Sequence, residues 1–413
     1  MRAEANNSLS NAIQNIEFMK FIVIGIDDNK EQQFSQEVID IIQSKTIFSG
    51  GKRHRKIVDS ILPSSYQWID ITVPLNDVFD AYKSFDEIIV FASGDPLFYG
   101  FANTIQKRLP EADIKVFPTF NSLQMLAHKS VMPYHDMYIV SLTGRNWEKF
   151  DEALISRYDK IGVLTDNKEH TPANIARYML EYGYNDYTMT VGELLGNKDN
   201  EKVSEVTLRE ATESDFAYPN NLILQKTNNR PRPFGIPESE FNLLDGRAKM
   251  ITKMPVRLVS LNMLDLREKS VFWDIGICTG SVSIEAKLQF PHLKIIAFEK
   301  REEGQELLIL NSKKFGTPGI EIVIDDFVNV NHKEYPRPDA VFIGGHGGKM
   351  KEIIEIIKDV LNKNGTIVFN SVSEESRKLF LEKLKINDLQ LAQTITIKVD
   401  SHNTIEIMQS YKR

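Results

Sequence analysis

Short apolar runs alternate with helix-like stretches along the first half of the chain. FIVIG at 21–25 ends in a glycine, DEIIVFA at 86–92 is followed by SGDP and a helix-like stretch, and NLILQK at 221–226 resembles a closing strand. Apolar runs of this length, bounded by turn-forming residues, are typical of buried strands. The alternation predicts a layered α/β domain over 21–226, although the sequence does not fix the order of its strands.

The segments that flank this domain have a different composition. Residues 1–20 are polar and carry Glu4 and Glu17, where a signal peptide would need an apolar core, so we expect a flexible N-terminus. The segment TNNRPRPFGIPE at 227–238 holds three prolines and no periodicity. Because proline stiffens the backbone and removes donors, this segment is predicted to be a linker to a second domain at 239–413.

The second half shows another alternating series. Five strand-like runs begin with VFWDIG at 271–276 and end with TIVFN at 366–370, and we interpret each as being followed by a helix. The last runs, ITIKVD and TIEIMQS, resemble an antiparallel pair. This pattern predicts an open parallel sheet wound by helices, in which a ligand binds beyond the carboxyl ends of the strands.

Three consecutive strand ends carry residues suited to a nucleoside. Glu299 ends the second strand, nineteen residues after Gly280, where its carboxylate can accept hydrogen bonds from both ribose hydroxyls. Asp325 and Asp326 end the third strand, where an adenine amino group could be recognised. The first strand leads into a turn whose candidate residues are Asp274, Gly276, Cys278, Thr279 and Gly280.

The spacing of this turn separates two kinds of cofactor. A dinucleotide turn requires Gly-x-Gly-x-x-Gly, whereas Gly276 and Gly280 are four residues apart with Cys278 between them. Asp274 suits a cationic or amino-bearing ligand better than a pyrophosphate. S-adenosylmethionine, with an ammonium, a sulfonium and a nucleoside, fits this turn. A tight strand–helix turn with an incidental glycine pair is the alternative.

Composition excludes several classes of protein. The 413 residues are too many for one ordinary domain, and 50 Lys+Arg against 57 Asp+Glu give a net charge of −7, which argues against a nucleic-acid partner. Cys278 is the one cysteine, so neither an intrachain disulfide nor a multi-cysteine zinc site is possible, and the eight histidines are scattered. No apolar run is long enough to predict a membrane span. We therefore expect a cytoplasmic protein without a metal site.

The second half resembles a known family. The stretch MITKMPVRLVSLNMLDLREKSVFWDIGICTGSVSIEA, followed by FIGGHGG, is similar to the decarboxylating precorrin methyltransferases of corrin biosynthesis. The resemblance implies a Rossmann-like class I methyltransferase that acts at C-15 of the macrocycle and removes carbon dioxide from the acetate on C-12. It adds Thr252 as a cofactor residue and Lys253 as a substrate residue. The family usually has a glycine in place of Cys278 and a small residue in place of His346, which is a candidate catalytic residue.

The first half resembles the tetrapyrrole methylases. FASGDPLFYGFANTI, PTFNSLQMLA, VSLTGR, TDNKEHTPANIA and VGELLG occur in the order of that superfamily and are most similar to its precorrin C-5 methyltransferase branch. The resemblance implies two α/β lobes with a cofactor folded into the cleft between them. The first loop departs from the usual Gly-x-Gly-Pro-Gly, because Asp27 and Asp28 follow Gly25. The implied cofactor residues are Gly25, Gly94, Asp95, Phe98, Asn121, Ser122, Leu164 and Leu194.

A basic cluster, GGKRHRK at 50–56, has two possible roles. A solvated helix start is the simpler interpretation. A precorrin, however, carries many acetate and propionate groups, and the guanidinium fork matches a carboxylate. Arg53 and Arg55, together with Arg145 of LTGR, are therefore candidate substrate residues.

Together these patterns predict a bifunctional enzyme of two fused methyltransferases. Each domain is expected to bind one S-adenosylmethionine, and the substrate is a precorrin, with any cobalt arriving inside it. The resemblance also implies a homo-oligomer. Two alternatives remain: a class I methyltransferase for RNA or protein with a degenerate first domain, and a nonenzymatic sensor of S-adenosylmethionine.

Overall fold

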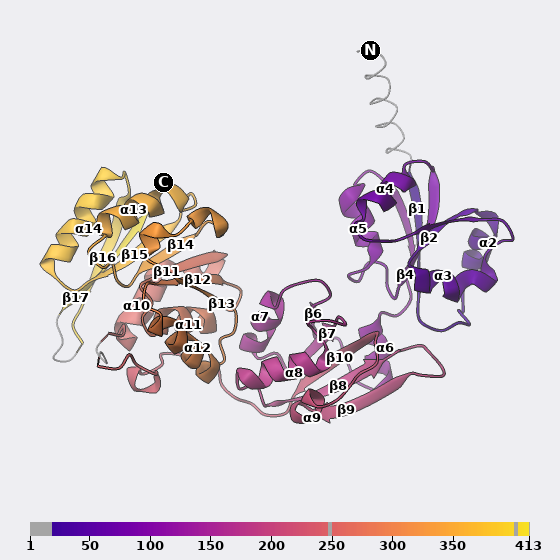
Figure 1. Ribbon diagram of the computed structural model, residues 1–413, viewed down its shortest axis with the longest axis horizontal. Helices are drawn as coiled ribbons and strands as arrows, with labels where there is room; N and C mark the ends of the chain where they lie inside the picture. The colour runs from indigo at the N-terminus through magenta and orange to yellow at the C-terminus, as the bar shows by residue number, and fades with distance from the viewer. Residues whose placement is uncertain (1–18, 247–249, 400–403, 413) are drawn as a thin grey trace, which may run out of the picture. The chain divides into compact units, whose positions relative to one another are not determined.

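The chain forms two compact units, which we describe separately (Figure 1). The computed structural model describes residues 19–246, 250–399 and 404–412. Most of the predicted flexible N-terminus, residues 1–18, therefore lies outside the described residues, and the first strand already begins at Lys20. The first unit contains the chain up to residue 143 together with 160–174 and 188–225.

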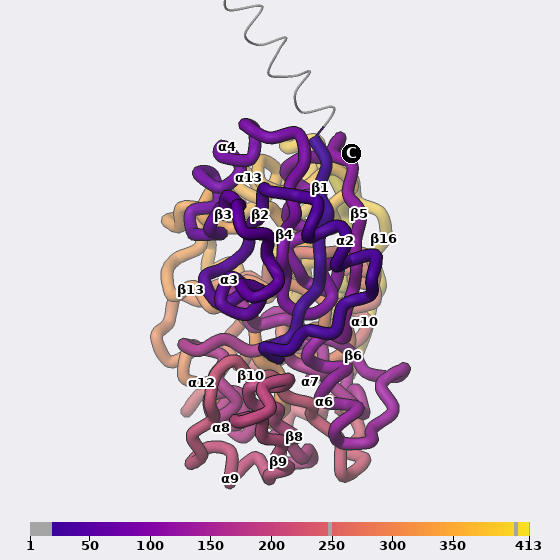
Figure 2. Tube along the Cα trace, turned by 90° about the vertical axis from the view of Figure 1, so that its right-hand side faces the viewer, coloured from indigo at the N-terminus to yellow at the C-terminus, as the bar shows by residue number. Residues whose placement is uncertain are grey.

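The first sheet is parallel throughout and follows the order β3-β2-β4-β1-β5. Figure 2 shows β1 between β4 and β5. Phe21 and Val23 enter one hydrophobic cluster while Ile22 and Ile24 enter another, so β1 is buried on both faces and reads as a continuous apolar run. The elements of this lobe are β1 (Lys20–Ile26), α2 (Gln36–Ser44), β2 (Ile47–Gly50), α3 (Lys52–Val58), β3 (Gln67–Asp70), α4 (Asn76–Tyr82), β4 (Glu87–Ser93), α5 (Phe101–Arg108) and β5 (Asp113–Phe117).

The second sheet is mixed and follows the order β6-β7-β10-β8-β9. The strand predicted to close the domain, β10, ends the series along the chain but lies in the middle of this sheet, with β7 antiparallel to it. Local sequence could not reveal this placement, because strand order depends on pairing between distant segments. The elements are α6 (Ser122–Lys129), β6 (Tyr138–Ser141), β7 (Lys160–Leu164), β8 (Tyr187–Glu193), β9 (Lys202–Thr207), α9 (Leu208–Thr212) and β10 (Asn220–Lys226).

The third sheet has seven strands in the order β13-β12-β11-β14-β15-β17-β16. The first five are parallel, and β17 and β16 form the predicted antiparallel pair at one edge. The α/β class and the Rossmann-like arrangement of this half are thus confirmed. The strands are β11 (Val271–Ile275), β12 (Lys294–Glu299), β13 (Ile320–Ile324), β14 (Ala340–Ile343), β15 (Thr366–Ser371), β16 (Gln390–Ile397) and β17 (Ile405–Tyr411).

The helices of this half correct one prediction. No α-helix follows β13, since Phe327–Asn329 and His332–Glu334 form only 3-10 turns. Pro336 and Pro338 follow these turns, and proline disfavours helix both at its own position and in the residue before it. The other four parallel strands are each followed by a helix. The α-helices are α10 (Met254–Leu264), α11 (Ser281–Gln289), α12 (Glu303–Phe315), α13 (Met350–Val360) and α14 (Glu374–Ile386).

The second unit also contains two segments from earlier in the chain, 144–159 and 175–187, in addition to 226–413. The first of these includes α7 (Glu148–Ser156), and the second includes most of α8 (Pro172–Glu181). Ile155 belongs to a buried cluster with Phe241 and Phe315, and the Tyr184 hydroxyl donates to the carbonyl of Gly316 at 2.7 Å. The compact units therefore do not divide simply at the predicted linker, 227–238.

Candidate active site

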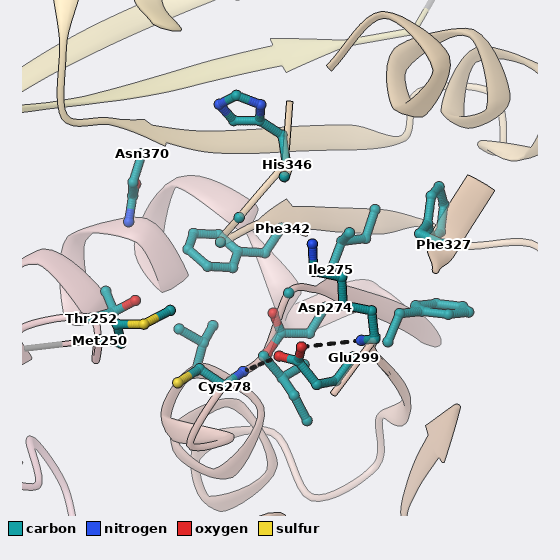
Figure 3. Close-up of a pocket in the computed structure, with 18 of the residues that line it drawn as sticks. Met250, Thr252, Asp274, Ile275, Cys278, Glu299, Phe327, Phe342, His346 and Asn370 are labelled. Atoms are coloured by element: carbon teal, nitrogen blue, oxygen red, sulfur yellow. Dashed lines mark hydrogen bonds between the residues drawn. The ribbon is translucent and has the colours of Figure 1, made fainter. Parts of the chain in front are cut away.

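A cavity of about 680 Å³ lies beyond the carboxyl ends of the parallel strands in the second unit (Figure 3). It collects candidate residues from four strand ends and from the segment before α10. The candidates that line it are Thr252, Lys253, Asp274, Gly276, Cys278, Glu299, Asp325, Asp326 and His346. Thr279 and Gly280 are not among its lining residues: Thr279 is buried, and Gly280 is the N-cap of α11.

Glu299 accepts several hydrogen bonds at the end of β12. Its Oε2 accepts from the backbone N–H of Cys278 at 2.9 Å, which joins this strand end to the glycine turn. The Arg301 guanidinium donates from Nε to Oε1 and from Nη2 to Oε2, both at 2.9 Å. Burial opposes ionisation of Glu299, but Arg301 and the surrounding N–H groups outweigh it and hold the pKa of this carboxyl below its usual value.

Asp274 is the last residue but one of β11 and is 1% exposed. The Ser283 hydroxyl donates to its Oδ2 at 2.6 Å, whereas Oδ1 has no hydrogen-bond partner among the described residues. Burial raises the pKa of Asp274 to about 7, and the bond from Ser283 opposes that shift only in part. A buried carboxylate with a free acceptor oxygen is suited to receive a cationic N–H group.

The turn between β11 and α11 brings two loops close together. Gly276 has φ +75°, and a Cβ there would lie 2.8 Å from the carbonyl oxygen of Gly345, so this position requires glycine. Cys278 also has a positive φ, +53°, in the region that disfavours L side chains. The structure thus explains why glycine suits this position and shows that the chain accommodates a cysteine there in a strained backbone.

The end of β13 presents two carboxylates with different partners. Asp326 pairs with Lys349 at 2.7 Å, and this ammonium, opposed by a smaller effect of burial, lowers the pKa of Asp326. Asp325 is exposed, and its Oδ1 accepts from the backbone N–H of Asp326 at 2.6 Å. Phe327 follows and supplies an apolar wall to the same cavity. This combination of a polar edge and an aromatic side chain is suited to a nucleobase.

The backbone at Thr252 is held by a buried ion pair. Arg257 and Glu285 are both 0% exposed and lie 3.3 Å apart. Arg257 Nη1 donates to the carbonyl of Thr252 at 2.9 Å, and Glu285 accepts from the backbone N–H groups of Gly235 at 2.8 Å and Ile236 at 3.1 Å. The pair therefore joins the predicted linker to the segment that lines the cavity.

His346 lies in the loop after β14, apart from Glu299 in Figure 3. Its Nδ1 accepts from the backbone N–H of Gly348 at 3.2 Å, and its ring contacts Phe369 edge to face. Burial lowers the pKa of the imidazole, so the neutral form is favoured at neutral pH. The geometry leaves Nε2 as the N–H nitrogen.

Several lining residues were not predicted from the sequence. Asn370, at the end of β15, could have been found by the rule that located Glu299, because it also follows a buried apolar run. Arg301 and Lys349 gave no comparable signal, since exposed cations after a strand are common. The further lining residues that the sequence analysis missed include Met250, Lys300, Phe327 and Phe342.

A smaller cavity, of about 240 Å³, lies in the first unit. Four candidates line it: Arg53, Gly94, Ser122 and Leu164. The other cofactor candidates are not among its lining residues, although all but Phe98 are next to one in the chain: Gly25, Asp95, Phe98, Asn121 and Leu194. Two of these support the local backbone, because a Cβ on Gly25 would lie 2.2 Å from the carbonyl oxygen of Gly94, and the Asn121 side chain caps α6.

The three candidate arginines have different surroundings. Arg53 lines the cavity, pairs with Asp28 at 2.9 Å and donates to the Ser93 hydroxyl at 2.9 Å. Arg55 lies over the Tyr66 ring, 5.7 Å from its centroid, and is not a lining residue. Arg145 is exposed and belongs to the second unit. The structure therefore brings only Arg53 of these three to the cavity.

The described residues contain no group of three or more His, Cys, Asp or Glu side chains arranged to hold a metal ion. Over the same residues, no helix is both long and apolar enough to cross a membrane.

Two family models match the chain, one on each side of the predicted linker at 227–238. The model of tetrapyrrole (corrin/porphyrin) methylases matches residues 20–212, and the model of the precorrin methyltransferase domain matches residues 245–412. A precorrin-6Y C(5,15)-methyltransferase [decarboxylating] from Sinorhizobium sp is 26% identical over 363 residues, covering 87% of this chain and 86% of that protein. The protein of the same description from Mycobacterium tuberculosis is 24% identical over 356 residues, covering 86% of this chain and 88% of that protein.

The second half alone has more similar relatives. A cobalt-precorrin-6B C(15)-methyltransferase (decarboxylating) from Salmonella typhimurium is 35% identical over 134 residues, covering 32% of this chain and 68% of that protein.

Proposed function

The chain belongs to the family of decarboxylating precorrin methyltransferases, and we propose that it methylates precorrin-6Y, or its cobalt form, at C-5 and C-15 and removes carbon dioxide from the C-12 acetate. The observation that supports this most strongly is the cavity of the second unit, where Asp274, Glu299 and Asp326 stand at three consecutive strand ends. Relatives of both activities match the chain, one of them over most of its length.

The cavity residues fit S-adenosylmethionine in chemistry and order. We assign the free Oδ1 of Asp274 to the ammonium, Glu299 to the ribose, and Asp326 with Phe327 to the adenine. Close approach of the cofactor to the turn requires Gly276. The first unit would hold a second cofactor along Gly94, Ser122 and Leu164.

The protein's contribution to catalysis is mainly positioning. S-adenosylmethionine supplies the methyl group on an excellent leaving group. The cavity must therefore hold the accepting carbon about 3–3.5 Å from that methyl and in line with it, and a strong general base is not required. His346 favours the neutral form and would donate from Nε2 to a substrate oxygen rather than remove a proton.

For decarboxylation, the cavity would hold the C-12 acetate away from water while the conjugated macrocycle accepts the electron pair. Lys253, a lining residue, is positioned to bind another carboxylate of the substrate. In the first unit Arg53 would have the same role after exchanging Asp28 for a substrate carboxylate. Assembly as a homo-oligomer stays a prediction.

Mass spectrometry tests the proposal directly. Purified protein, S-adenosylmethionine and precorrin-6Y are expected to give a product with two added methyl groups and one lost carbon dioxide. Parallel reactions with cobalt-free and cobalt-loaded substrate identify the form that is used. An unchanged substrate in both reactions would contradict the proposed function.

A further inference from the structure

The carboxylate of Glu299 has no remaining capacity for a ribose. Its Oε1 accepts from the backbone N–H of Lys300 at 3.0 Å, the backbone N–H of Arg301 at 3.2 Å and the Arg301 Nε at 2.9 Å, and its Oε2 accepts from the Cys278 N–H and the Arg301 Nη2. A carboxylate offers about four lone-pair sites. With its side chain only 2% exposed, Glu299 cannot accept two further hydroxyl groups in this arrangement.

The donors to Glu299 differ in how easily they can leave. Three of them are backbone N–H groups, fixed by the turn at Cys278 and by the strand end itself. The other two belong to the Arg301 guanidinium, which ends a long side chain that is 23% exposed. A ribose can therefore reach Glu299 by replacing the guanidinium without disturbing the fold.

The surroundings of Arg301 provide a second role for the released group. Arg301 is itself a lining residue of the cavity, and its Nη1 donates to the weakly accepting sulfur of Met250 at 3.8 Å. The Cys278 thiol is a further weak partner of the same guanidinium. Once displaced, the guanidinium needs an anionic partner. The precorrin substrate of the proposed function carries many carboxylates, and a guanidinium binds a carboxylate in a bidentate manner.

We propose that the ribose of the cofactor displaces Arg301 from Glu299 and that the freed guanidinium then binds a carboxylate of the macrocycle. This proposal rests on the proposed function and adds an order of binding to it, cofactor before substrate. Arg301 thus competes with the cofactor and assists the substrate, a combination that a purely structural residue would not show.

Calorimetry with S-adenosylhomocysteine, the demethylated cofactor, measures the first effect at the site that Glu299→Ala abolishes. Arg301→Ala is expected to bind it about tenfold more tightly than the unmodified protein, a gain of ~1.4 kcal/mol, because no guanidinium has to be displaced. The same variant is expected to raise the KM for the macrocycle about tenfold in the C-15 reaction. Arg301→Lys keeps the charge but lacks the planar guanidinium. Its affinity for S-adenosylhomocysteine and its KM for the macrocycle should therefore lie between those of Arg301→Ala and those of the unmodified protein.

Arg267→Ala is the matched control, because Arg267 is exposed and is not a lining residue of this cavity. Arg267→Ala should leave both the affinity for S-adenosylhomocysteine and the KM for the macrocycle unchanged. Weaker cofactor binding in Arg301→Ala and Arg301→Lys, or unchanged binding in both, would overturn the proposal. If the unmodified protein does not bind S-adenosylhomocysteine at all, the proposed function itself fails, which is a distinguishable result.

Discussion

At the scale of single residues, the candidate site combines a strained backbone with a buried carboxyl group. Asp274 lies in β11, and Cys278 follows four residues later in the turn between β11 and α11. The sequence revealed their positions because they follow a buried apolar run. It could not reveal the positive φ of Cys278 or the missing partner of Asp274, which depend on how the turn packs against the loop at Gly345.

Cys278→Gly should stabilise the protein. A non-glycine residue in the left-handed region costs roughly 1–2 kcal/mol, which the change to glycine would remove. Glycine also gives the unfolded chain more conformational freedom, and this offsets about half of the stabilisation. We expect the free energy of unfolding of the second unit to rise by up to about 1 kcal/mol in chemical denaturation. Cys278→Ala, which removes the sulfur but keeps the strain, is the control, and an equal effect of both variants would contradict this explanation.

Asp274 should make stability fall with pH. The native state keeps its proton up to about pH 7, whereas the unfolded chain releases it near the ordinary value of 3.8. Between these values the native state binds more protons, so the free energy of unfolding decreases as the pH rises. Asp274→Asn should remove this contribution. The free energy of unfolding of the variant, relative to that of the unmodified protein, should therefore increase between pH 4 and pH 8.

Denaturation curves at several pH values measure this effect, with the exposed Asp359→Asn as the control. If the free energy of unfolding depends on pH in the same way for Asp274→Asn and the unmodified protein, the Asp274 carboxyl is ionised throughout this range and the explanation is wrong. Asp274→Asn should also weaken binding of S-adenosylhomocysteine, since a neutral amide receives an ammonium less well than a carboxylate.

At the scale of secondary-structure elements, strand ends were predictable and strand order was not. Glu299 and Asp325 could be located because Glu299 ends β12 and Asp325 directly follows β13, two strands with a clear apolar pattern. The central position of β10 depends on pairing between distant segments. The missing helix after β13 has a local cause, because Pro336 and Pro338 follow the 3-10 turns. The bonds from Arg301 to Glu299 join residues only two positions apart, but they have no signature in the sequence because cations after a strand are common.

The buried pair Arg257–Glu285 connects α10, α11 and the predicted linker. Glu285→Ala would leave the buried guanidinium without its partner, which typically costs about 3–5 kcal/mol. We expect a loss of that size in chemical denaturation, together with weaker cofactor binding, because Arg257 also holds the carbonyl of Thr252.

The double variant Arg257→Met with Glu285→Leu provides the comparison. It removes both charges, so it should cost less than the single change Glu285→Ala. A single variant as stable as the unmodified protein would show that the pair does not hold the Thr252 segment.

At the scale of the whole molecule, the proposed function requires two methyltransferase sites on one chain. Each unit has its own cavity: the larger contains nine candidate residues and the smaller contains four. The assignment of segments 144–159 and 175–187 to the second unit was not predictable from the sequence, because both lie within the span of the tetrapyrrole methylase motifs. Fusion of the two activities would keep the product of one site close to the other.

The number of cofactor sites per chain tests the central claim most directly. Titration calorimetry of the full chain with S-adenosylhomocysteine should give two sites, and the same titration of Glu299→Ala should give one, with the affinity of the remaining site unchanged. A single site in the unmodified protein, or two sites of unaltered affinity in Glu299→Ala, would contradict it.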